Sequence, residues 1–361
     1  MQPAPPPAAA LLDLLRAGTV IPAVPLALDA RRRFDERRQR ALIRYYLEAG
    51  AGGIAVGMHF TQFEIRLPGI DLFEPVLALC REEAAVYMQR TGRRVATIAG
   101  IDGATESALA QAATARRLGY DIGIVSLRAF TGAHERSLLA HMARLAEVIP
   151  LFGFYLLTGV GGIRLPYAFW RDLVEQPWLH GIKIAPFDRY GTNEVMRAVA
   201  EAGRQDDLAL YTGNDESIVH DLITPFTYRV GGRDVVVRMR GGLLGQWACW
   251  TRRAVELLDR LHAVAEGQAP VDAALLALAA QITDANSALF DPAHGFAGSI
   301  PGVNEVLRRQ GLLAGTWTLR RDEVLSPGQS EEIDRVIAAY PHLTDDEFVA
   351  ANRDRWLGGR C

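Results

Sequence analysis

Short apolar runs alternate with longer amphipathic segments along most of the chain. The short runs are aliphatic and β-branched, which is typical of strands that are buried on both faces. Eight of them are predicted as strands, over 20–26, 53–56, 95–99, 122–126, 151–156, 181–184, 208–212 and 241–244. Between them, apolar positions repeat with helical spacing over 36–49, 72–91, 105–118, 134–148, 167–175 and 193–202. This alternation predicts βαβ units and a parallel sheet.

The number of units predicts how the sheet is arranged. Eight strand–helix units within about 240 residues fit a closed (β/α)8 TIM barrel better than an open doubly wound sheet. The first strand is not followed by Gly-x-Gly-x-x-Gly, so the dinucleotide-binding alternative lacks its fingerprint. Alternating runs around Gly231 and Gly232, within 226–239, predict an inserted β-hairpin. We therefore expect an α/β TIM barrel with an inserted β-hairpin and a C-terminal helical appendage.

Three segments are expected along the chain. Residues 1–17 form a Pro/Ala-rich arm, 18–265 the barrel with its hairpin, and 266–361 a largely helical region. The N-terminus lacks the basic start of a signal peptide. No run of about 18 apolar residues suggests a membrane span. A cytoplasmic protein is therefore expected.

Composition and charge exclude several classes of partner. The chain has 49% hydrophobic and 22% charged residues and a net charge of −3, which favours neither nucleic acid nor an anionic membrane as partner. The three cysteines, Cys80, Cys249 and Cys361, are far apart and form no Cys-x-x-Cys pair. We expect free thiols, with no disulfide framework and no thiolate zinc site.

One lysine stands out in the sixth predicted strand. Lys183 is the only lysine of the chain, since every other basic residue is arginine. Its neighbours are aliphatic, and lysine is almost never buried without a reason. Burial favours the neutral amine, a nucleophile for carbonyl carbon. The alternatives are a structural lysine paired with an acid, or one that reaches solvent at the strand end.

Tyr155 is the second candidate catalytic residue. It lies on the fifth predicted strand, one strand before Lys183. Neighbouring strand ends are expected to bring the two side chains together at the barrel mouth. A phenol beside a Schiff base could pass the proton that dehydration of the carbinolamine requires. Alternatively, Tyr155 is an aromatic core residue.

At these residues the chain resembles the dihydrodipicolinate synthase and N-acetylneuraminate lyase family of class I aldolase barrels. The resemblance implies a Schiff-base lysine at Lys183, its tyrosine at Tyr155, a keto-acid substrate, and a homo-oligomer, either a dimer or a tetramer. We expect no cofactor and no metal. The resemblance rests on the following segments: Thr19-Val-Ile-Pro-Ala-Val-Pro-Leu26, Ile98-Ala-Gly-Ile-Asp-Gly-Ala-Thr-Glu-Ser107, Tyr155, Gly181-Ile182-Lys183, Tyr211-Thr-Gly-Asn-Asp215 and Gly298-Ser-Ile-Pro-Gly-Val-Asn304.

The chain also departs from the family pattern. Where the family has Gly-Thr-Thr-Gly-Glu after its second strand, this chain has Gly57-Met-His-Phe-Thr-Gln-Phe-Glu64. His59 and Thr61 are candidates to bind the substrate carboxylate in its place. Arg128, in the loop where the family has a tyrosine, and Asn214, in the seventh-strand segment, are further candidates for substrate binding. The family's arginine after the fifth-strand tyrosine is absent here as well.

These residues predict a Schiff-base-forming lyase, an aldolase or hydro-lyase, that acts on pyruvate or a longer 2-keto acid and is not a true dihydrodipicolinate synthase. Two alternatives remain open. One is a metal-dependent barrel lyase with His59 and the acids Asp102, Asp188 or Asp215 as ligands, although no His-x-His pair supports it. The other is a barrel that has lost catalysis and binds a small molecule.

Overall fold

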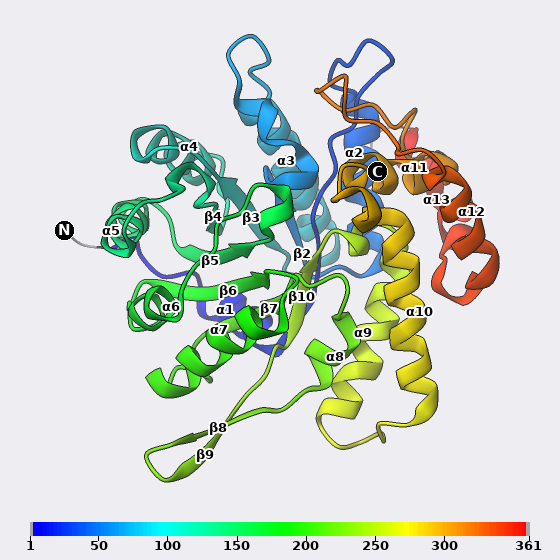
Figure 1. Cartoon of the computed structure of the whole chain (residues 1–361). Coiled ribbons are helices and arrows are strands. Elements are labelled where there is room, and N and C mark those ends of the chain that lie inside the picture. Colours follow the sequence, from blue (N-terminus) through cyan, green and yellow to red (C-terminus); the bar gives the residue numbers. More distant parts are fainter. Residues whose placement is uncertain (1–2, 359–361) are drawn as a thin grey trace. The chain divides into compact units, whose positions relative to one another are not determined.

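A computed structural model describes residues 3–358 (Figure 1). Its eight parallel strands form one sheet. The order is β1-β10-β7-β6-β5-β4-β3-β2. A parallel bridge between Ala23 and Ala55 joins the two ends of this order, so the sheet closes on itself. The fold is the expected (β/α)8 TIM barrel. The strands are β1 Val20–Pro22, β2 Gly53–Val56, β3 Ala96–Ile101, β4 Ile122–Val125, β5 Leu151–Leu156, β6 Leu179–Ala185, β7 Ala209–Thr212 and β10 Gly241–Leu244.

Helices connect successive strands, as the apolar periodicity predicts. They begin and end at sequence signals: Asp35 accepts a hydrogen bond from the Arg38 amide at the start of α2, and left-handed Gly203 ends α7. The first strand is shorter than predicted, because Pro22 and Pro25 lack the backbone donor that a strand needs. The connecting helices are α2 Glu36–Ala49, α3 Phe73–Thr91, α4 Thr105–Arg117, α5 Glu135–Ala146, α6 Tyr167–Val174, α7 Arg189–Ala202 and α8 Ile218–Ile223.

The inserted hairpin is confirmed. Strands β8, Phe226–Val230, and β9, Arg233–Val237, pair antiparallel. Gly231 and Gly232 connect them with φ values of 55° and 81°, and two consecutive positive φ angles are what the favoured two-residue hairpin turn requires. The Tyr228 hydroxyl donates a hydrogen bond to the Asn193 side chain of α7 at 3.0 Å, and Figure 1 shows the hairpin next to that helix.

The described chain divides into two compact units. The first comprises the described residues up to Thr19 together with Ile98–Leu243 and Asp259–Pro270, and the second comprises Val20–Thr97, Leu244–Leu258 and the described residues from Val271 onward. The core of the first unit includes Phe152, Phe169 and Trp170, all fully buried. The remaining helices are α1 Ala9–Ala17, α9 Thr251–Ala265, α10 Ala273–Phe290, α11 Ser299–Arg309, α12 Gln329–Ala339 and α13 Asp346–Leu357.

Helix α10 has the length and composition of a membrane-spanning helix among the described residues. The same test is passed by core helices of soluble proteins, and α10 packs against α11 and α12 within the second unit. It also carries Asp284, which binds Arg335 of α12 with two hydrogen bonds of 2.9 Å. These contacts are those of a packed helix in a folded domain.

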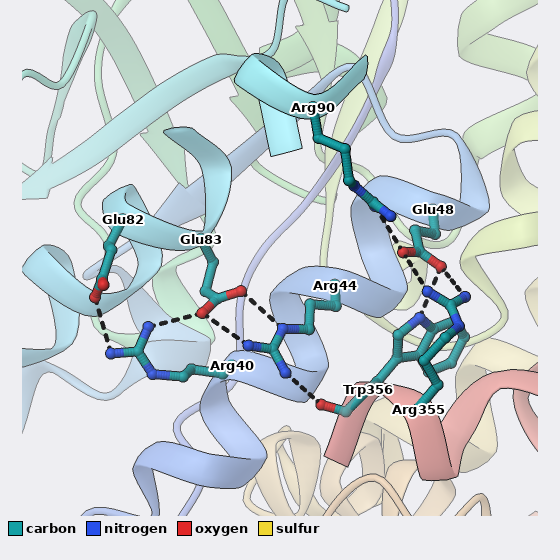
Figure 2. A network of polar contacts seen from close by, with 8 residues as sticks. All are labelled: Arg40, Arg44, Glu48, Glu82, Glu83, Arg90, Arg355 and Trp356. Carbon is teal, nitrogen blue, oxygen red and sulfur yellow. Dashed lines mark hydrogen bonds and ion pairs between the residues drawn. The ribbon is translucent and has the colours of Figure 1, made fainter. Parts of the chain in front are cut away.

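Polar contacts hold the C-terminal helix α13 on α2 within the second unit (Figure 2). Glu48 accepts hydrogen bonds from Arg90, at 2.9 Å, and from the Trp356 indole, at 2.8 Å, and it forms an ion pair with Arg355. Burial would raise the pKa of Glu48, but hydrogen bonds from Arg355, Trp356 and Arg90 outweigh it and lower this pKa to about 2. Arg44 donates to the Trp356 carbonyl at 2.7 Å. The C-terminal region is therefore part of the folded core of this unit.

Replacing Trp356 is expected to destabilise the protein strongly. The side chain is fully buried and packs on the Tyr45 ring at 5.5 Å between centroids. Trp356→Ala should cost about 3–5 kcal/mol of unfolding free energy, because it leaves a cavity and removes the indole donor from Glu48. Urea unfolding measures this cost. Arg353→Ala, which removes an exposed ion pair on the same helix, is the control and should cost less than about 1 kcal/mol.

Two of the three cysteines lie within the described residues. Cys80 and Cys249 are buried free thiols, as expected, and burial raises the pKa of the Cys80 thiol. Cys361 lies outside the described residues.

Candidate active site

Lys183 lies on the interior face of the barrel. In the pairing of β5, β6 and β7, Lys183 is level with Phe154 on one side and Tyr211 on the other. Paired residues of parallel strands point to the same face, and successive residues alternate between faces. The opposite face is covered by helices, since Thr212 of β7 donates a hydrogen bond to Asp221 of α8 at 2.6 Å. Lys183, Phe154 and Tyr211 therefore face inward.

The surroundings of Lys183 favour its neutral form. Only 9% of the residue is exposed, and Nζ lies 4.7 Å from the centroid of the Phe154 ring. Burial lowers the pKa of Lys183 from 10.5 to about 8, while the negative charge of Asp215 opposes that shift. Such an amine is deprotonated far more often near neutral pH than an exposed lysine. The expectation that this lysine is buried is confirmed.

Gly213 makes room for the lysine. A Cβ atom at this position would lie 2.6 Å from Lys183 Cε and 2.6 Å from Ala185 Cβ. Both distances are shorter than real Cβ contacts, so any side chain here would displace the lysine stem. The absence of a side chain at residue 213 thus fixes the path that Lys183 takes through the interior.

Tyr155 lies toward the helix side of the sheet, and its part in proton transfer at Lys183 stays a prediction. It is level with Ile184, one residue beyond Lys183, and its ring packs on Trp170 of α6 at 5.1 Å between centroids. A Cβ at Gly191 of α7 would come within 3.2 Å of its hydroxyl oxygen. Burial raises the pKa of Tyr155. The phenol therefore lies among the helices, in the aromatic-core alternative.

An irregularity in the strand pairing explains this difference. Leu151 is level with Leu179, but the next residue, Phe152, is level with Gly181 and not with His180. His180 is thus an extra residue in β6 that shifts the register of everything after it. Without this bulge Tyr155 would be level with Lys183, and with it Phe154 takes that place.

Asn214 belongs to a buried polar network on the helix side. Its amide nitrogen donates hydrogen bonds to Asp221 at 2.8 Å and to Thr192 at 3.1 Å, and its oxygen accepts one from the Phe187 amide at 3.0 Å. Asp221 is fully buried and also forms an ion pair with Arg189. Both ends of the Asn214 amide are engaged within the protein, so the residue holds the loops after β6 and β7 in position.

Two acids follow β7 and were not predicted as catalytic residues. Asp215 entered the sequence analysis only as a possible metal ligand, and Glu216 did not enter it at all. Both follow Asn214, and only 5% of Asp215 is exposed. Burial, with the nearby charges of Asp221 and Asp215, raises the pKa of Glu216 to about 8.

Arg128 is paired within the first unit. Its Nε lies 2.9 Å and 3.0 Å from the two carboxylate oxygens of Asp102, at the ends of β4 and β3. Asp102 is almost fully buried, whereas the Arg128 side chain is 38% exposed. The guanidinium is thus held in a fixed orientation at the carboxyl ends of the strands, where substrates bind in barrels of this kind.

Comparisons with known proteins agree with the fold. No family model matches the chain. The dihydrodipicolinate synthase of Oceanobacillus iheyensis has a TM-score of 0.71 at 18% identity, over 92% of this chain and 99% of that structure. The N-acetylneuraminate lyase of Fusobacterium nucleatum, complexed with pyruvate, has a TM-score of 0.68 at 15% identity, over 90% and 98%. The chain has the fold of the dihydrodipicolinate synthase and N-acetylneuraminate lyase family.

A sequence relative points to the same family. A curated 4-hydroxy-tetrahydrodipicolinate synthase of Macrococcus caseolyticus is 28% identical over 145 residues, which make up 40% of this chain. The match spans 45% of the length of that relative. The resemblance to the dihydrodipicolinate synthase and N-acetylneuraminate lyase family that the sequence indicates is thereby confirmed.

His59 and Thr61, in the segment where this family has its paired threonines, lie in the second unit. The Thr61 hydroxyl accepts a hydrogen bond from the Gly57 amide at 2.8 Å and donates one to the Val24 carbonyl at 2.7 Å, so it holds its own loop. His59 Nε2 lies 3.2 Å from the Ser299 hydroxyl, and its ring contacts Phe60. Binding of a substrate carboxylate by these two residues stays a prediction.

The acids of the metal alternative have other partners. Asp188 caps α7 by accepting hydrogen bonds from the Tyr190 and Gly191 amides, each at 3.0 Å, and Asp102 is paired with Arg128. Among the residues that the structure describes, no three His, Cys, Asp or Glu side chains group as metal ligands would. The geometry of the described residues thus gives the metal-dependent lyase no support.

Proposed function

We propose that this protein is a Schiff-base-forming lyase, an aldolase or hydro-lyase, that acts on pyruvate or a longer 2-keto acid through Lys183 and is not a true dihydrodipicolinate synthase. The observation that carries the proposal is the chain's only lysine, buried on the inner face of the barrel with its pKa lowered to about 8. Proteins of the same fold have been solved with pyruvate, among them the Fusobacterium nucleatum lyase and the dihydrodipicolinate synthase of Acinetobacter baumannii.

The proposed reaction begins with attack of the neutral Lys183 amine on the keto carbon. Loss of water from the carbinolamine gives an iminium ion, which withdraws electrons from the neighbouring carbon. In an aldol substrate, the bond between that carbon and the next, hydroxyl-bearing carbon breaks: the hydroxyl loses its proton and becomes the carbonyl of an aldehyde, and the enamine remains. In a hydro-lyase substrate, loss of a proton from the carbon next to the iminium first gives the enamine, whose electrons expel the hydroxyl group from the following carbon, and this group leaves with a proton as water. The reverse direction uses the enamine as the nucleophile. The missing threonine pair and the missing arginine after β5 support a substrate other than that of a dihydrodipicolinate synthase.

Reduction of the iminium tests this proposal directly. Protein incubated with pyruvate and sodium borohydride is expected to gain the mass of one reduced pyruvate adduct, and peptide mapping should place it on Lys183. Lys183→Ala should gain none, which also controls for reaction at the N-terminal amine. If a series of 2-keto acids leaves the wild-type mass unchanged, the lyase assignment is wrong.

The rate of adduct formation is expected to depend on pH as the lowered pKa dictates. Since the neutral amine attacks, the rate should rise with pH up to about 8 and then level off, instead of rising toward 10.5. In the unfolded chain the lysine keeps its proton up to about pH 10.5. Between about pH 8 and 10.5 the unfolded state therefore binds more protons than the folded state, and the contribution of Lys183 to the free energy of unfolding rises with pH in that window. Quenched-flow trapping across pH 6–10 measures the kinetic limb. A trapping rate that keeps rising up to about pH 10.5 would contradict a buried amine with a lowered pKa.

A second candidate function is a barrel that binds a small molecule without turning it over. It is favoured by the position of Tyr155 on the helix side and by the engagement of Thr61 in its own loop. The two functions differ in one measurement. A binding protein shows a thermal shift with keto acids but no borohydride-trapped adduct, whereas the lyase shows both. A homo-oligomer, dimer or tetramer, stays a prediction for either function.

A further inference from the structure

We propose that protonation of His141 detaches the loop of residues 128–134 from helix α5 and so makes the carboxyl end of β4 sensitive to mild acid. His141 belongs to α5, within the first unit, and only 2% of it is exposed. The proposed reaction does not use this residue. The opening of the loop is a property of the fold, and it does not depend on the proposed function.

The contacts of the His141 ring suit its neutral form. Nδ1 lies 2.9 Å from the Thr105 hydroxyl at the start of α4, and a hydroxyl group can either donate to it or accept from it. Among the described residues, Nε2 is buried without a hydrogen-bond partner. The protonated ring carries N–H groups at both nitrogens. It would therefore bury a charge together with a donor that finds no acceptor.

The charges around His141 also oppose protonation. Burial, and next to it the positive charge of Arg144 on α5, lower the pKa of His141 from 6.5 to about 4. Glu106 of α4 forms an ion pair with Arg144 at 2.7 Å, and Arg128 of the loop is paired with Asp102. Once water reaches the ring, its ordinary pKa of 6.5 returns, so the open state takes up the proton first as the pH falls.

The loop depends on the same ring for its attachment to α5. All residues of 128–134 are exposed except Phe130, which is half-buried. The Phe130 ring packs on the His141 ring with 4.5 Å between centroids. Hydration of the His141 ring therefore requires Phe130 to move away, and the loop then loses its apolar contact with the helix. Because the loop also carries Arg128, opening displaces a candidate for substrate binding.

The sign and size of the effect follow from the two protonation states. The closed loop is stabilised above pH 6.5, where the ring is neutral in both states, and this advantage is lost as the pH falls toward 4. The equilibrium constant for opening should rise about 20-fold between pH 7 and pH 5, as expected for uptake of one proton.

Hydrogen exchange of the backbone amides in 128–136, corrected for the intrinsic effect of pH, measures this opening. Wild-type exchange should accelerate about 20-fold from pH 7 to pH 5. His141→Gln can keep a hydrogen bond to Thr105 but cannot be protonated, so its exchange should change less than about twofold. The control is His134→Gln, which removes the exposed histidine of the same loop and should keep the wild-type dependence.

An NMR titration of the His141 ring in the wild-type protein is a second measurement that needs no variant. A midpoint below about pH 5.5 supports the inference, and a higher midpoint overturns it. Wild-type exchange that is independent of pH, or the same dependence in His141→Gln, also overturns it, as does equal acceleration in the barrel strands, which would show global unfolding. Circular dichroism checks the fold at pH 7; if His141→Gln is not folded, His141→Leu and the NMR titration decide.

Discussion

Lys183→Met is expected to lower the turnover of any keto-acid substrate by about 10⁴-fold or more, equivalent to about 5.5 kcal/mol of transition-state stabilisation. Methionine has nearly the length of lysine and suits the apolar surroundings of Phe154 and Gly213, but it offers no amine. The covalent route is then closed, and the rest of the site can only bind and orient the substrate.

The same variant should remain folded. A buried cation costs free energy that an apolar side chain of similar volume does not, so thermal melting of Lys183→Met at pH 7 should occur no lower than that of wild type. Melting temperature, keto-acid binding by thermal shift and steady-state rates measured on one preparation separate these effects. Residual turnover above one hundredth of the wild-type rate would show that the reaction does not pass through Lys183.

Asp221→Ala is expected to destabilise the first unit by about 3–5 kcal/mol. The carboxylate is fully buried, accepts hydrogen bonds from Thr212 at 2.6 Å and Asn214 at 2.8 Å, and forms an ion pair with Arg189. Alanine leaves the fully buried donors of Thr212 and Asn214 without their acceptor. Urea unfolding followed by circular dichroism measures the loss.

A matched control is available on the hairpin. Asp234 pairs with Arg229, and both side chains are largely exposed, so Asp234→Ala should cost less than about 1 kcal/mol. Asp221→Ala should also slow adduct formation on Lys183, since Asn214 loses the contact that holds its neighbour Gly213 against the lysine stem. Equal losses of stability in the two alanine variants would contradict the role assigned to the buried network.

The sequence predicts the barrel because the signals that define it are local. Each strand is a short apolar run, and each helix repeats apolar positions over several turns. The Gly231-Gly232 pair indicates the hairpin turn. The structure differs from the predicted elements mainly at their ends, as at β1, where prolines interrupt the strand. The closure of the sheet follows from the number of units.

The candidate site is predicted in part. Lys183 is found because a lone lysine inside an apolar strand has few explanations other than chemistry. Tyr155 is misplaced because its face depends on the pairing between two strands: a single bulge at His180 reverses every later residue, and the distance between Tyr155 and Lys183 along the chain cannot show it. The buried network around Asp221 is missed because its partners, Thr212 and Asn214, reach it only across the fold.

The occurrence of lysine at a single position also gives the protein a built-in reporter. A protease that cuts only after lysine cleaves the denatured chain once, into the pieces 1–183 and 184–361, which are of nearly equal size. A reduced adduct on that nitrogen blocks the cut. The fraction of full-length chain left on a gel then counts occupied sites for any candidate substrate, without a label and without knowledge of the product.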